Sequence, residues 1–134
     1  MASAAMGYAG LSLSREVEKG LPVSALDQLV RALAPNDATF AFRLVPRATL
    51  ARRRSGGARA ARLSPAEGAR VARLATVWEM ARDIWKDDDH AREFLFRPHM
   101  LLDGQRPVDL VLANEFGGRL VEELLGRLQY GTAI

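Results

Sequence analysis

Apolar residues recur at helical spacing along most of the chain, and no segment sustains an alternation of apolar and polar residues. Intervals of three and four residues place such side chains on one face of a helix. The spacing predicts helices over residues 13–19, 22–33, 38–44, 46–54, 65–85 and 90–96, another opening at Pro107, and a last one over 119–129. We therefore expect an all-α fold.

Capping residues and helix breakers set the expected boundaries. Ser64-Pro65-Ala66-Glu67 has the pattern of a capping box, in which the Ser and Glu side chains satisfy backbone N–H groups of the first turn. The run Asp87–Asp89 predicts the start of the following helix. Gly117-Gly118 is interpreted as a turn. The last helix is expected to pack through Leu120, Val121, Leu124, Leu125 and Leu128.

Charge is distributed unevenly along the chain. Up to Arg62 there are 10 Lys and Arg against 4 Asp and Glu, whereas the remainder has 9 against 12. The front is thus at +6 and the back at −3, within a total of +3. A basic N-terminal part favours binding to the phosphate backbone of a nucleic acid, and an acidic C-terminal part favours a different kind of partner. Ser55–Arg62 is interpreted as a flexible basic linker. The expected organisation is a disordered N-terminus over 1–12, a first domain with its linker over 13–62, and a second over 63–134.

The segment from Asp37 to Arg54 has features of a DNA-reading element. Two short predicted helices meet at Leu44-Val45, where the glycine usual in a helix-turn-helix is missing, and the second helix turns only Leu50 inward. A slim helix with exposed donors suits the major groove, so an Arg near its start is expected to read bases and a basic run at its end to contact phosphates. The candidate DNA-binding residues are Arg47, Thr49, Arg52, Arg53 and Arg54. In the alternative interpretation, the Arg run only solvates a surface.

Catalysis, cofactors and metal ions are not expected. The chain has no Cys, and its two His, His90 and His99, lie in different predicted segments. It has neither a nucleophile elbow nor a glycine-rich phosphate loop after a strand. The acidic run beside His90 is interpreted as a favourable helix start. Since no secretory leader or apolar run of membrane-spanning length is found, we expect a cytoplasmic protein.

The end of the sequence has an unusual character for a terminus. Residues 122–134 form an amphipathic segment that runs into the apolar and aromatic sequence Tyr130-Gly131-Thr132-Ala133-Ile134. Termini are commonly polar and dispensable, so this one indicates a peptide that docks on a partner. The alternative, that Tyr130 and Ile134 pack back on their own domain, stays open.

Three strings together resemble a known family. They are Pro46-Arg47-Ala48-Thr49-Leu50-Ala51-Arg52-Arg53, then Leu63-Ser64-Pro65-Ala66-Glu67, then Leu125-Gly126-Arg127-Leu128-Gln129-Tyr130-Gly131. In order and rough spacing they are similar to the MbcA/ParS/Xre antitoxins, which accompany toxins with a RES domain. The resemblance covers about residues 13–134. The chain departs from the family where His99 follows Pro98 in place of a common Asn, while Gly104 and Pro107 keep the frame of that loop.

The resemblance implies a function for each half. The front would be an Xre-like helix-turn-helix that binds and represses the promoter of its own operon. The back would be a small helical toxin-binding domain that supports a homodimer and larger assemblies with the toxin. The partner would be an NAD-degrading RES-domain toxin whose active site is covered by the antitoxin's C-terminal end, through Arg127, Gln129, Tyr130 and Gly131. The alternative is a helix-turn-helix regulator whose C-terminal domain only dimerises it.

Overall fold

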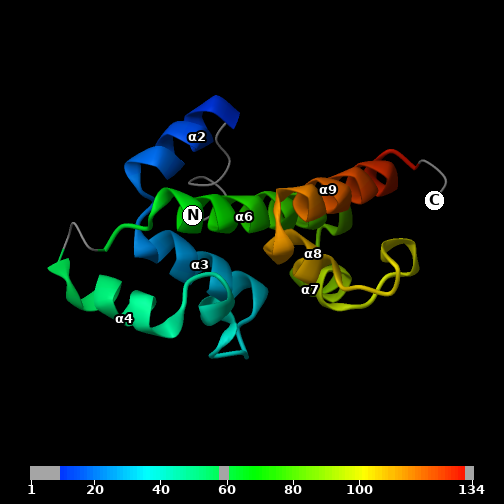
Figure 1. The fold of residues 1–134 in the computed structure, drawn as a ribbon. Helices are drawn as coiled ribbons and strands as arrows, with labels where there is room; N and C mark the ends of the chain where they lie inside the picture. The colour runs from blue at the N-terminus through cyan, green and yellow to red at the C-terminus, as the bar shows by residue number, and fades with distance from the viewer. Residues whose placement is uncertain (1–9, 58–60, 132–134) are drawn as a thin grey trace. The chain divides into compact units, whose positions relative to one another are not determined.

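The computed structural model describes residues 10–57 and 61–131, and its regular secondary structure there is helical (Figure 1). Within these ranges the extended backbone forms two isolated bridges and no strand, which confirms the all-α prediction. The chain divides into two compact units, residues 1–72 and 73–134. Helix α6, Pro65–Trp85, contributes residues to both.

Among the described residues of the first unit, four short helices precede α6. They are α2 (Gly10–Lys19), α3 (Val23–Leu33), the 3-10 helix η1 (Phe40–Arg43) and α4 (Arg47–Ser55). Gly20 follows the last residue of α2, with a φ of +99° that favours glycine. The helix expected over 38–44 is a single 3-10 turn, because Asp37 draws Thr39 into a local turn, accepting from its backbone N–H at 2.9 Å and its hydroxyl at 2.8 Å.

The segment expected to be a flexible linker is attached to the first unit at its C-terminal end. The Val23 N–H donates to the Ala61 carbonyl at 2.9 Å, and the Leu63 N–H donates to the Leu21 carbonyl at 2.7 Å. The division between the units falls further on, inside α6 after Ala72. Residues 58–60 lie outside the described residues. So do residues 1–9 of the N-terminus expected to be disordered, whereas residues 10–12 begin α2.

Helix α6 begins at the predicted capping box. The Ser64 N–H donates to Glu67 Oε1 at 2.9 Å, and the Glu67 N–H donates to Ser64 Oγ at 3.2 Å. Each contact satisfies a backbone donor that the first turn leaves without an intrahelical partner. The apolar residues that recur at helical spacing along α6 are buried at Val71, Leu74, Ala75, Trp78 and Ala81.

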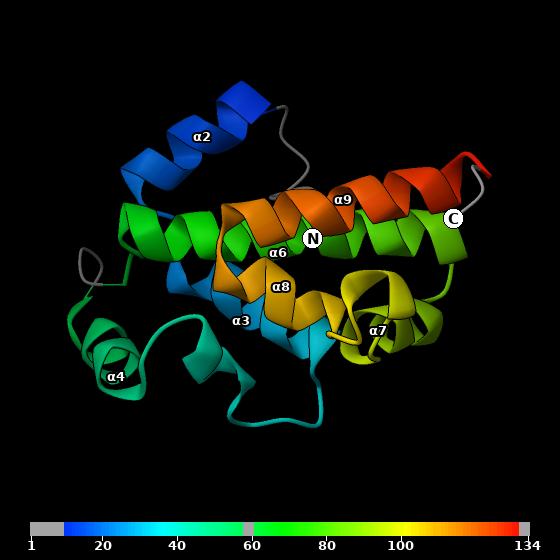
Figure 2. The same cartoon turned by 45° about the vertical axis from the view of Figure 1, so that its right-hand side comes forward.

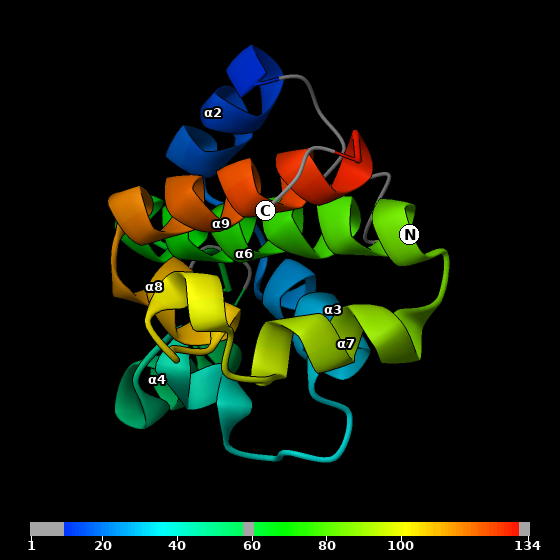
Figure 3. The same ribbon diagram turned by 90° about the vertical axis from the view of Figure 1, so that its right-hand side faces the viewer.

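The second unit packs further helices against the C-terminal part of α6. They are α7 (Asp88–Phe96), the 3-10 helix η2 (Met100–Leu102), α8 (Pro107–Ala113) and α9 (Glu115–Gln129). Asp87 caps α7 by accepting from the His90 N–H at 3.1 Å, in the acidic run where a helix start was predicted. Figures 2 and 3 show α9 alongside α6, with the two helices running in the same direction. No helix among the described residues is long and apolar enough to cross a bilayer.

The turn predicted at Gly117-Gly118 is wrong, because both glycines lie in the first turn of α9. Asn114 caps this helix and accepts from the Gly117 N–H at 2.9 Å. A Cβ at Gly117 would lie 2.0 Å from the Leu110 carbonyl oxygen, and a Cβ at Gly118 would lie 2.7 Å from Arg73 Cδ. The glycines therefore permit α9 to approach its neighbours closely and do not break the helix.

The predicted packing of α9 is correct for only part of its face. Val121, Leu124 and Leu125 are buried, as expected. Leu120 and Leu128, expected in the core, are 46% and 36% exposed. Leu120 lies at the edge of the buried stripe that runs through Gly117, Val121 and Leu124. Leu128 continues this stripe at helical spacing but falls in the last turn, where residues 127–131 are all exposed.

Candidate functional site

Helix α4 lies on the first unit with a single buried side chain, Leu50. The turn that precedes it contains Leu44 and Val45, both fully buried. Leu44 has right-handed helical angles, with φ −93° and ψ −42°, which a leucine adopts without strain. The turn therefore needs no glycine, and the two apolar residues in the usual glycine place anchor η1 and α4.

Two of the predicted DNA-binding arginines extend into solvent. Arg47 is exposed at the first position of α4, and its guanidinium carbon lies 4.1 Å from the centroid of the Phe42 ring. This cation–π contact restricts the side chain without neutralising its charge. Arg52 is exposed near the end of α4, and Thr49 is half-buried between them along the helix.

Arg53 is used inside the first unit. Its Nη2 donates to Glu67 Oε2 at 3.1 Å, its Nε lies 2.8 Å from Glu67 Oε1, and its Nη1 donates to the Arg62 carbonyl at 3.1 Å. Burial opposes ionisation of Glu67, but the Ser64 N–H and the Arg53 guanidinium outweigh it and lower the pKa of Glu67. Arg53 thus joins α4 to the capped start of α6.

Arg54 makes the second tie between α4 and the rest of the first unit. Its two terminal nitrogens donate to the two carboxylate oxygens of Asp27 on α3, at 2.9 and 2.7 Å. This bidentate hydrogen bonding lowers the pKa of Asp27 and raises that of Arg54. Sequence reasoning missed both ties because the acidic partners lie 14 and 27 residues from the arginines.

On the second unit, large apolar side chains reach solvent from η2 and α9. We call this set the apolar surface. Apart from Leu11, it includes every large hydrophobic residue that is exposed in the described part of the chain: Met100, Leu101, Phe116, Leu120, Leu128 and Tyr130. Contiguous exposed apolar patches mark sites of protein association, and Leu101 of η2 and Leu120 of α9 line one groove.

A groove lies between η2 and α9 within the apolar surface. It is lined by Leu101, Leu102, Leu120, Glu123, Leu124 and Arg127. The groove thus has an apolar floor with one acidic and one basic side chain, an arrangement typical of the core and rim of a protein interface. Arg127, predicted to contact a partner, lies in it, whereas the leucines were expected to be core residues or were not singled out.

The C-terminal end of α9 presents Tyr130 to solvent. Its side chain is 81% exposed, while its backbone N–H donates to the Gly126 carbonyl at 3.2 Å and ends the helix. Gly131 follows with a φ of +68°, in the left-handed region that favours glycine. Tyr130 therefore does not pack back on its own domain. Thr132, Ala133 and Ile134 lie outside the described residues.

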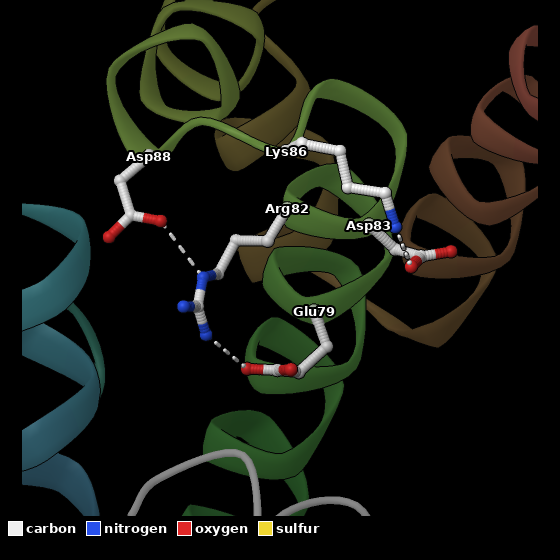
Figure 4. Close-up of a pocket in the computed structure, with 5 residues that line it drawn as sticks. All are labelled: Glu79, Arg82, Asp83, Lys86 and Asp88. Carbon is white, nitrogen blue, oxygen red and sulfur yellow. Dashed lines mark hydrogen bonds and ion pairs between the residues drawn. The ribbon is translucent and has the colours of Figure 1, made fainter.

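Gln129 faces its own domain, unlike Tyr130. Its Nε2 donates to Asp83 Oδ2 on α6 at 3.1 Å, and Lys86 Nζ lies 2.9 Å from the other oxygen of Asp83. Figure 4 shows Asp83 and Lys86 in a cleft lined by charged residues. In the same cleft, Arg82 Nη1 lies 3.2 Å from Glu79 Oε1, and Arg82 Nε lies 3.0 Å from Asp88 Oδ1. The cleft holds three acidic and two basic side chains, and the ion pairs among them offset most of the charge.

The two histidines have local structural partners. His99 Nδ1 accepts from the Leu101 N–H at 3.2 Å at the start of η2, and His90 Nδ1 contacts the capping carboxylate of Asp87. Across the described residues no three His, Cys, Asp or Glu side chains gather as a metal site would require.

Two family models match successive parts of the chain. The antitoxin Xre-like helix-turn-helix domain matches residues 12–75, which include α4. The antitoxin Xre/MbcA/ParS C-terminal toxin-binding domain matches residues 80–131, which include the apolar surface and the end of α9. No curated protein matches the chain.

Proposed function

Because the chain belongs to the Xre/MbcA/ParS antitoxin family, with a helix-turn-helix domain and a toxin-binding domain, we propose that its toxin is an NAD-degrading RES-domain enzyme. The chain is itself a binding and regulatory protein of the type II antitoxin class, not an enzyme. In this proposal it forms a homodimer and larger assemblies with the toxin, and it represses its own operon.

Neutralisation is proposed to occur by covering the toxin's active site with the C-terminal end of α9. The observation that carries this proposal is the 81% exposure of Tyr130 at the end of the toxin-binding domain. A rigid aromatic side chain that loses its hydration in a pocket is a common source of binding energy. Arg127 and the apolar surface extend the contact along α9, and Gly131 sets the direction in which the chain leaves the helix.

Promoter binding is proposed to use α4 as the helix that enters the major groove. Arg47 reads a base near the start of the helix, and Arg52 contacts phosphate near its end. Thr49, on the same helix, contributes a neutral hydrogen-bonding group. Arg53 and Arg54 act first as supports that hold α4 on Glu67 and Asp27, and add positive charge to the surroundings.

The test is co-expression with a RES-domain toxin, with growth and cellular NAD as readouts. The intact chain should restore both, and Tyr130→Asp should restore neither although it folds. Full restoration by Tyr130→Asp would contradict the covering of the active site. Arg47→Ala combined with Arg52→Ala should keep restoration and lose promoter repression. If that double variant lost restoration as well, the separation of the two activities would be wrong.

A further inference from the structure

We infer that Gln129 is a positioning residue that Asp83 holds, and that it does not contact the toxin. This inference rests on the proposed function, since it concerns how the toxin-binding end of α9 is presented. Its basis is the hydrogen bond from Gln129 Nε2 to Asp83 Oδ2 at 3.1 Å. Asp83 also pairs with Lys86 at 2.9 Å, as Figure 4 shows. The resemblance to the family implies that Gln129 contacts the toxin, but in the structure its side-chain amide donates to Asp83 of its own domain.

The last turn of α9 needs such a contact because little apolar burial holds it. The helix is anchored at its start by the close approach of Gly118 to Arg73 and in its middle by Leu124 and Leu125. From Arg127 to Gly131, every residue is exposed. A helix end without burial frays, since the last carbonyl groups lack intrahelical donors. The bond to Asp83 joins this turn to α6.

The consequence for binding is preorganisation. Tyr130 follows Gln129 directly, so fixing Gln129 limits the directions in which the Tyr130 side chain leaves the helix. A group already held in its bound position loses less conformational entropy on association. The smaller entropy loss makes the complex more stable, which appears mainly as slower dissociation. Asp83 and Gln129 are solvent-accessible, so we expect the loss of their bond to speed toxin dissociation by about two- to tenfold.

The test is a double-mutant cycle of Asp83→Ala and Gln129→Ala in the full chain. Toxin dissociation is followed by surface plasmon resonance, and amide hydrogen exchange at Tyr130 and Gly131 is measured in the free protein. Each single variant should speed both processes, and the double variant should be no faster than the faster of the two single variants. Asp83→Asn keeps an acceptor oxygen and should recover most of the loss. Glu79→Ala is the matched control, because Glu79 pairs with Arg82 and not with Gln129.

Different results would overturn different parts of the inference. Unchanged exchange in Asp83→Ala would show that the bond does not hold the helix end. Faster exchange with unchanged dissociation would show that holding the end is irrelevant to the toxin. Additive effects, or a loss confined to Gln129→Ala, would return Gln129 to the toxin contact. If the unmodified chain bound no RES-domain toxin, the proposed function would fail, whereas the exchange data would still decide whether Asp83 holds the end of α9.

Discussion

Helices α4 and α9 are both exposed on their units, but they expose opposite chemistries. Helix α4 buries Leu50 alone and presents charge, whereas α9 buries a full stripe and still exposes Phe116, Leu120 and Leu128. A charged helix suits a polyanion because counterion release rewards each phosphate contact. An exposed apolar surface gains favourable free energy only when another surface covers it and excludes water. The two helices are therefore suited to different macromolecules.

The two helices also differ in the polar contacts that support them. Two guanidinium groups of α4, from Arg53 and Arg54, are tied to carboxylates on other helices of the unit. The end of α9 is tied by the neutral side chain of Gln129. These ion pairs hold the C-terminal end of α4, through Glu67 on α6 and Asp27 on α3. At the end of α9 a single hydrogen bond to the Asp83 carboxylate provides the support, in a turn where every residue is exposed.

The largest effect on stability is expected from disturbing the packing of α9 against α8. Gly117→Ala would place a Cβ 2.0 Å from the Leu110 carbonyl oxygen, so α9 must shift away from α8. We expect a loss of about 3 kcal/mol in the free energy of unfolding, measured by urea denaturation. Gly126→Ala is the matched control on the same helix. A Cβ at position 126 would have no neighbouring atom within 4 Å, so we expect this substitution to stabilise the protein by about 0.5–1 kcal/mol. A mild effect at Gly117 would contradict the close approach of the two helices.

The second test places a charge in the groove of the apolar surface. Leu120→Glu should leave the fold intact, because that side chain is 46% exposed, but should weaken toxin binding by about a hundredfold. Binding is measured by isothermal titration calorimetry, with light scattering as a check on self-association. Leu11→Glu introduces the same charge at an exposed leucine of α2 and should change neither. If Leu120→Glu altered only self-association, the groove would be an interface between copies of the chain.

A smaller effect should separate the arginines of α4 from one another. Arg47→Ala should weaken promoter binding by about tenfold. Arg52→Ala should reduce the slope of log affinity against log salt concentration by about one, because one phosphate contact is lost. Arg54→Ala should instead lower the free energy of unfolding, by less than about 1 kcal/mol, because it breaks the exposed pair with Asp27. Fluorescence anisotropy with promoter DNA at several salt concentrations measures the first two, and thermal unfolding the third. Equal effects of Arg47 and Arg54 on DNA binding would contradict the division of roles.

The elements that sequence reasoning identified correctly depend on local chemistry. The capping box of Ser64 and Glu67, the Asp87 cap and the inward Leu50 each involve residues within a few positions of one another. The errors arose where tertiary contacts decide. Gly117 has the composition of a turn, and only the position of Leu110 shows why a helix needs it there. Helical spacing predicted a wide apolar face on α9 but could not say that Leu120 would be left outside.

The smallest expected effects are opposite responses to pH of one glutamate in each unit. The lowered pKa of Glu67 means that its contribution to stability is complete above its ordinary pKa of 4.5 and is lost as pH falls through the lowered value. Burial raises the pKa of Glu122 on α9, with Arg119 opposing, so that side chain lowers stability once pH rises through 4.5 and past the raised value. At pH 7, Glu67→Gln should therefore destabilise the protein and Glu122→Gln should stabilise it slightly. Thermal unfolding from pH 3.5 to 7.5 measures both, and shifts of the same sign would contradict the contrast between the two sites.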